Sequence, residues 1–94
     1  MTTLHREMGY TRAEFMRTLP SALRNQSYRV EGNIISIQVG LSIVRIELGT
    51  ELVRRIASIV LPYMPVSFDF GDLNPGEAKQ FLDHFDLYYR KGGG

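Results

Sequence analysis

The chain has 94 residues, of which 44% are apolar and 22% charged, and it contains no cysteine. This length suits a single domain, and the lack of cysteine excludes a disulfide framework, cysteine-ligated zinc, iron–sulfur clusters and thiol nucleophiles. Eleven Lys and Arg against ten Asp and Glu leave a net charge of +1, so the composition shows no strong basic bias toward nucleic acid or an anionic membrane.

The N-terminal segment, residues 1–10, lacks the apolar stretch of a secretory signal, and we expect it to form a flexible arm. The longest strongly apolar run, residues 56–64, holds nine residues, whereas a membrane span needs about 20. The sequence therefore predicts a cytoplasmic protein with no membrane contact.

A first helix is predicted to begin at Thr11. Thr11 and Glu14 have the spacing of a capping box, and apolar residues follow on one helical face. Pro20 lacks a backbone donor and its ring would clash with the carbonyl of Met16, so we expect a break or kink near Leu19.

From residue 27 onward the apolar period changes to two. Segments 28–31, 35–39 and 43–48 alternate apolar and polar residues, and Gly32-Asn33 and Gly40 mark the turns between them. This pattern predicts a three-strand antiparallel meander with Tyr28 and Val30 on its buried face. Its polar face would carry six side chains, namely Arg29, Glu31, Ser36, Gln38, Arg45 and Glu47.

The second half of the chain predicts a helix, a strand and a final helix. Thr50 is expected to cap a helix that ends at Pro62, because apolar residues repeat there at helical spacing. Alternation over residues 66–70 predicts a fourth strand. Asn74, Pro75 and Glu77 mark the start of the last helix, which carries a single apolar stripe of Ala78, Phe81, Leu82, Phe85, Tyr88 and Tyr89.

Together these elements predict an α+β fold arranged as a two-layer sandwich. The order is α-β-β-β-α-β-α, a three-strand antiparallel meander followed by a fourth strand after a helical crossover. Residues 11–91 would form one domain, with the N-terminal arm before it and a flexible glycine tail, residues 92–94, after it.

No motif with catalytic chemistry is present. The glycines form no phosphate-binding pattern, and Asp69 and Asp72 do not have the spacing of a calcium loop. His5 and His84 are far apart in sequence, and Tyr88, rather than a carboxylate, lies one helical turn after His84. We therefore predict a non-enzymatic protein with no catalytic residue, no cofactor and no metal.

The leading prediction for function is a protein–protein interaction or accessory module, with self-association into a homodimer as one form of it. Tyr63 and Met64 lie between two prolines in a stiff connector, which is a typical recognition point. Adjacent tyrosines on one helix cannot both face the core, so one of Tyr88 and Tyr89 should lie at an interface margin. The remaining candidates for partner binding, Arg54 and Arg55, would form a charged rim.

Two alternatives come from other features. Nine arginines against two lysines would suit a nucleic-acid-binding surface, although the predicted sheet lacks the paired exposed aromatics typical of RNA recognition. The end Gly92-Gly93-Gly94 would suit a C-terminal carrier or a small enzyme subunit. Ubiquitin-like carriers, however, reach such a tail from a strand, and here a predicted helix precedes it.

Overall fold

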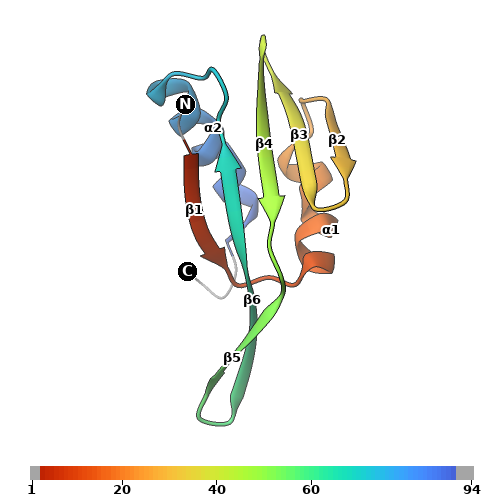
Figure 1. Cartoon of the computed structure of the whole chain (residues 1–94), viewed down its shortest axis with the longest axis vertical. Helices are drawn as coiled ribbons and strands as arrows, with labels where there is room; N and C mark the ends of the chain where they lie inside the picture. The colour runs from red at the N-terminus through yellow and green to blue at the C-terminus, as the bar shows by residue number, and fades with distance from the viewer. Residues whose placement is uncertain (1–2, 91–94) are drawn as a thin grey trace.

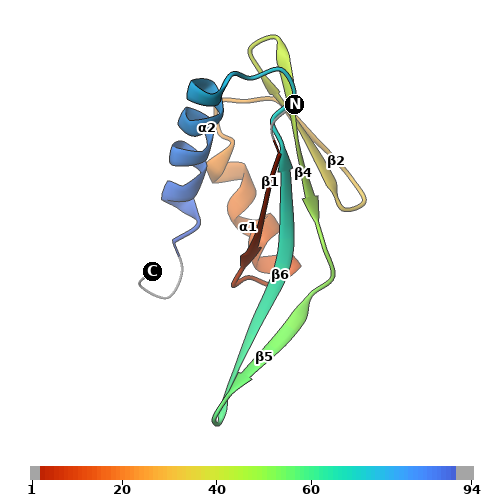
Figure 2. The same ribbon diagram turned by 60° about the vertical axis from the view of Figure 1, so that its left-hand side comes forward.

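The computed structural model describes residues 3–90 and shows an α+β fold, as predicted. Two helices cover one face of an antiparallel six-stranded sheet and leave the other face open (Figures 1 and 2). The elements are, in chain order, β1 (Thr3–Met8), α1 (Arg12–Ala22), β2 (Tyr28–Glu31), β3 (Ile34–Val39), β4 (Ser42–Leu48), β5 (Leu52–Ile56), β6 (Ile59–Asp69) and α2 (Pro75–Tyr88). The structure contains more strands than the sequence analysis predicted.

The sheet has the strand order β1-β6-β4-β3-β2, and β5 pairs with the first half of β6. The predicted meander is confirmed, because β2, β3 and β4 are consecutive antiparallel neighbours. Tyr28 and Val30 face the helix side of the sheet, but each remains 38% exposed. Their strand, β2, forms the edge of the sheet, beyond the part of the face that the helices cover.

Residues 3–8 of the N-terminal segment form a strand, where we expected a flexible arm. β1 pairs with β6 along its whole length, from Thr3 opposite Asp69 to Met8 opposite Met64. Arg6 interrupts the apolar alternation of this strand, which is why the pattern did not predict it. Its guanidinium lies 5.0 Å from the centre of the Phe68 ring and forms an ion pair with Asp86 across 3.2 Å.

The prediction of a helix after Thr50 is wrong. This segment forms a β-hairpin in which β5 and β6 are joined by a two-residue turn at Ala57 and Ser58. Apolar residues occur on both faces of the hairpin, so the period-two signal of a half-buried strand is lost and the pattern imitates a helix. β6 therefore follows β5 directly and lies antiparallel to β4, with no helical crossover.

Both helix starts are as predicted, but Pro20 does not break α1. Capping boxes are present at Thr11 with Glu14 and at Asn74 with Glu77. The first helix continues through Pro20 to Ala22. Because only two helical residues follow the proline, the hydrogen bond that it cannot donate to the Met16 carbonyl is one of the last in the helix.

One core lies between the helices and the sheet and includes aromatic rings from all layers. Phe15 of α1 stacks on Tyr89 with ring centres 4.7 Å apart, and Phe85 of α2 stacks on the same ring at 4.4 Å. Phe68 of β6 meets Phe85 edge to face at 5.4 Å. This cluster fixes both helices against the middle of the sheet.

The molecule is elongated, with extents of 47 × 26 × 24 Å. The length arises because the β5–β6 hairpin continues beyond the layer covered by the helices and projects from the body (Figures 1 and 2). Neither helix within residues 3–90 is long and apolar enough to cross a bilayer.

Candidate protein-binding site

The most unusual surface of the molecule is the projecting hairpin, residues 52–63, which we call the apolar hairpin. Six of its aliphatic side chains are between 42% and 58% exposed, namely Leu52, Val53, Ile56, Ile59, Val60 and Leu61. Large exposed apolar patches on small proteins mark interaction surfaces, whereas isolated exposed apolar residues are ordinary. Here the exposed residues are contiguous on two paired strands.

Strand pairing distributes these side chains over two faces. Opposed residues in an antiparallel pair share a face, and Leu52 pairs with Tyr63 while Val53 pairs with Pro62. One face, continuous with the open side of the sheet, carries Leu52, Arg54, Ile56, Ile59, Leu61 and Tyr63. The other face, continuous with the helix side, carries Val53, Arg55, Val60 and Pro62.

A β-bulge separates the hairpin from the body. Gly49 donates a backbone hydrogen bond to Pro65, and the next pair is Leu52 with Tyr63. Two residues, Thr50 and Glu51, therefore lie opposite Met64 alone. Bulges of this kind bend a strand and increase its twist, which directs the hairpin away from the body.

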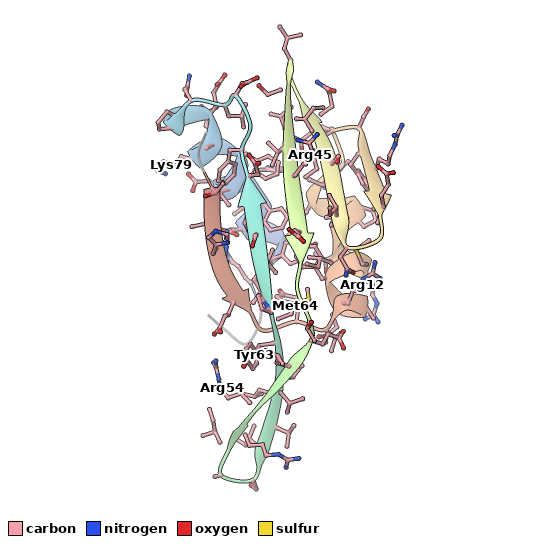
Figure 3. All side chains as sticks on the ribbon, viewed as in Figure 1. Arg12, Arg45, Arg54, Tyr63, Met64 and Lys79 are labelled. Carbon is pink, nitrogen blue, oxygen red and sulfur yellow. The ribbon has the colours of Figure 1, made fainter. Side chains whose placement is uncertain are left out.

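The base of the hairpin is held to β1 by Arg54. Its guanidinium donates a hydrogen bond to the Glu7 carboxylate across 3.0 Å and lies 4.5 Å from the centre of the Tyr63 ring (Figure 3). The hydrogen bond and the charge of Glu7 raise the pKa of Arg54 above its ordinary value. The side chain is thus a fixed cation at the point where the hairpin leaves the body.

Of the six predicted partner-binding residues, the structure brings three together on the hairpin. Arg54, Arg55 and Tyr63 lie there, with both arginines exposed and Tyr63 half-buried. Met64, expected in an exposed connector, is instead fully buried in the core. It lies on β6 opposite Met8 and faces the helices.

The two adjacent tyrosines lie at the end of α2 and not on the hairpin strands, and they differ in environment. Tyr89 is buried, and its hydroxyl donates a hydrogen bond to the carbonyl oxygen of Phe15 across 2.8 Å. Tyr88 is half-buried, receives a hydrogen bond from Arg24 at 3.1 Å and packs on the exposed His84 ring. Tyr89 is therefore a core residue, and Tyr88 lies at the margin of α2.

The aliphatic residues of the hairpin are the part of this site that sequence reasoning missed. The helix predicted after Thr50 included Leu52, Val53, Ile56 and Val60 in its apolar repeat and ended at Leu61 and Pro62, and Ile59 was given no role. Two signals favoured a strand. The segment is rich in β-branched residues, and Pro62 and Pro65 follow closely where a continuing helix would not tolerate them.

The open face of the sheet is polar, and its charges are mixed. The six side chains predicted for this face lie there on β2, β3 and β4, with Arg29 and Arg45 close to Glu31 and Glu47 along their strands. His5 Nδ1 lies 2.8 Å from Ser67 Oγ on the same face. Both side chains lie on an open sheet, so the contact is a cross-strand hydrogen bond without the oriented, enclosed base of a catalytic pair.

Potential metal ligands do not cluster in the part of the chain that the structure describes. Within residues 3–90, His, Asp and Glu side chains form no group of three that could hold a metal ion. Two of the arginines form ion pairs, Arg6 with Asp86 and Arg54 with Glu7. The glycine tail proposed for a carrier lies outside the described residues.

Comparisons with known proteins add no further constraint on this site: no protein-family model, no curated protein and no solved structure matches the chain.

Proposed function

We propose that this chain is a protein-binding module and that the apolar hairpin is the surface its partner covers. The supporting observation is the contiguous set of six aliphatic side chains, 42–58% exposed, on a ribbon that projects from an otherwise well-packed body. No chemistry-bearing cluster of comparable definition competes with it among the described residues.

The energetics of the hairpin favour this function. Two-stranded ribbons are marginally stable in water on their own, and beyond its base this one has neither helix nor third strand to cover it. Burying the exposed half of one isoleucine or valine contributes on the order of 1 kcal/mol. Binding of a partner over one face of the hairpin would therefore be favoured by several such free-energy contributions. The partner would also stabilise the ribbon.

The composition of the hairpin indicates the kind of partner surface. Apolar centres with an arginine at the edge are typical of protein interfaces, where arginine and large apolar residues are enriched. Arg55 is exposed on the same face as Val53 and Val60. The partner should thus present an apolar groove or sheet with carboxylates at its margin.

Site-specific photo-crosslinking in cells tests the proposal. A photoreactive residue replacing Ile59 should crosslink to protein, whereas the same residue at Leu41 should not. Leu41 is a matched control because it is a fully exposed aliphatic residue between β3 and β4. The turn that joins these two strands lies at the opposite end of the molecule from the apolar hairpin (Figure 1). Equal crosslinking at both positions, or the absence of protein adducts at Ile59, would contradict a protein-binding hairpin.

A double variant, Ile56→Ser with Ile59→Ser, provides the functional arm of the test. Both side chains are 55% exposed and lie outside the core, so we expect the free energy of unfolding to change little. Crosslinks formed from a photoreactive residue at Val60 should disappear in this background. If purified protein instead floats with phospholipid vesicles through the same two residues, the hairpin is a lipid-binding element and the proposal is wrong.

A further inference from the structure

We infer that the partner at the hairpin's edge is a second copy of this chain, bound by antiparallel pairing of β5 with β5 about a two-fold axis at Val53. This inference rests on the proposed function, because it identifies one occupant of the same hairpin. It is carried by the free backbone edge of β5 and by the charges that flank it.

The first observation is that β5 has a single neighbour in the described sheet. β5 pairs with β6 and no other strand, so its second edge is available along residues 52–56. The two-residue turn makes Ile56 and Ile59 a hydrogen-bonded pair, so bonded and non-bonded pairs alternate from there. Val53 and Arg55 therefore direct their N–H and C=O groups outward.

The second observation is that the other edge of the hairpin is protected. Pro62 lies opposite Val53 in a non-bonded pair, so its nitrogen points to the side of β6 away from β5. Proline has no N–H to donate, and proline on an edge is one way in which natural sheets prevent pairing. The outward edge of β5 contains no proline and carries two fully usable donor–acceptor residues. A second strand can therefore add at β5 but not continuously at β6.

Charge selects the register of this pairing. An axis at Arg54 or Arg55 would place an arginine against the same arginine of the other copy, which is unfavourable. An axis at Val53 places Glu51 of each copy opposite Arg55 of the other, so two complementary pairs form by symmetry. Glu51 directly precedes β5, and its carboxylate accepts a hydrogen bond from the backbone N–H of Arg12.

Such pairing is an isologous interface, in which the same surface is used by both copies and the assembly closes at two. The result is a four-stranded antiparallel ribbon with β6 strands outside and β5 strands at the centre. Its outer edges are those carrying Pro62, so the assembly does not propagate. Three strands or more with apolar faces are also the condition under which a ribbon becomes stable.

A charge-swap series tests the inference. The mass of the full chain should be measured by light scattering against concentration, because an elongated monomer elutes early from a sizing column. We expect a reversible dimer. Arg55→Glu and Glu51→Lys should each weaken dimerisation about tenfold or more, and the double variant carrying both should restore it.

Single cysteines report the register directly, because the natural chain has none. Val53→Cys should form a disulfide-linked dimer on mild oxidation, since the axis brings two copies of this position within disulfide reach. Val60→Cys is the control, because it is similarly exposed but its counterpart lies three strand spacings away, roughly 14 Å across the ribbon, and is offset along the strands as well. Both are conservative changes at exposed positions, so folding is preserved.

Two results would overturn the inference. One is a monomer at every accessible concentration. The other is a dimer whose affinity does not change with the charge swaps and whose disulfide forms no better at Val53→Cys than at Val60→Cys. That result would place the interface elsewhere. A monomer that still crosslinks to another protein through Ile59 would reject self-pairing alone, whereas a lack of any protein adduct would reject the proposed function as well.

Discussion

The hydroxyl of Tyr89 donates a hydrogen bond to the carbonyl oxygen of Phe15, 2.8 Å away, and the two rings stack with centres 4.7 Å apart. The pair joins the end of α2 to the first turns of α1 across 74 residues of sequence. Within residues 3–90 it is the one buried hydrogen bond from a side chain to the backbone that joins the two helical segments. Removing it should therefore change the free energy of unfolding by a measurable amount.

Tyr89→Phe should lower the free energy of unfolding by about 1–1.5 kcal/mol, because it removes a buried hydrogen bond and keeps the ring. Chemical denaturation followed by circular dichroism measures this change. Tyr88→Phe is the control. Its hydroxyl contacts exposed Arg24, so we expect less than about 0.5 kcal/mol, and an equal loss in both variants would contradict the assignment of Tyr89 to the core.

The same tyrosine should make stability depend on alkaline pH. Burial raises the pKa of Tyr89 above its ordinary value of 10.0, with the nearby Tyr10 adding to the effect. Below pH 10 the phenol is neutral in both states and this contribution is constant. Above pH 10 the unfolded chain loses the proton first, so the free energy of unfolding should fall as pH rises. In Tyr89→Phe the decline above that pH should be shallower, and parallel curves would refute the prediction.

Gly71→Ala should be strongly destabilising. Gly71 has φ +58°, and a Cβ placed there would lie 2.5 Å from the carbonyl oxygen of Ile43, which is backbone and cannot rotate away. Gly32→Ala is the matched comparison, since Gly32 has φ +62° but no atom within 4 Å of the added carbon. Thermal or chemical unfolding should show a loss of about 1 kcal/mol for Gly32→Ala and a further 1–3 kcal/mol or so for Gly71→Ala.

Ala57→Gly should stabilise the hairpin turn. Ala57 has φ +54°, a region that costs an L-residue about 1 kcal/mol and glycine almost nothing. Amide hydrogen exchange of Arg54 and Leu61, which pair across the ribbon, should slow in the variant. Ser58→Gly, at the other turn position, should leave this exchange unchanged or accelerate it. Faster exchange in Ala57→Gly would show that the turn is not limited by its backbone conformation.

The elements that the sequence predicted well are those in which a local signal agrees with the tertiary contacts. Thr11 with Glu14 and Asn74 with Glu77 satisfy the first backbone donors of their helices locally, so both helix starts are as expected. The alternation of apolar and polar residues, with glycines at the turns, likewise identified β2, β3 and β4. One face of that meander packs on the core, as the burial pattern of β3 and β4 shows, and the other is exposed to solvent.

The elements that were missed depend on partners distant in sequence. β1 contains an arginine on its inner side, and only Phe68 and Asp86 make that position tolerable. The apolar hairpin has no buried face to give a period of two, so its residues fit a helical pattern equally well. The candidate site was therefore only partly predicted. The arginines and Tyr63 were identified, whereas four of the six aliphatic residues that define the surface were placed in the apolar repeat of a helix.

The single extra residue of the bulge opposite Met64 governs the direction in which the ribbon leaves the body. Opposed residues of an antiparallel pair share a face, so deleting Thr50 would place Glu51 opposite Met64 and keep Leu52 opposite Tyr63. Both faces of the ribbon would then carry the same side chains as before, while the bend and the extra twist at its base would be lost. A change of one codon in length would thus re-aim the binding surface of this protein without altering the residues on that surface or the body that carries it.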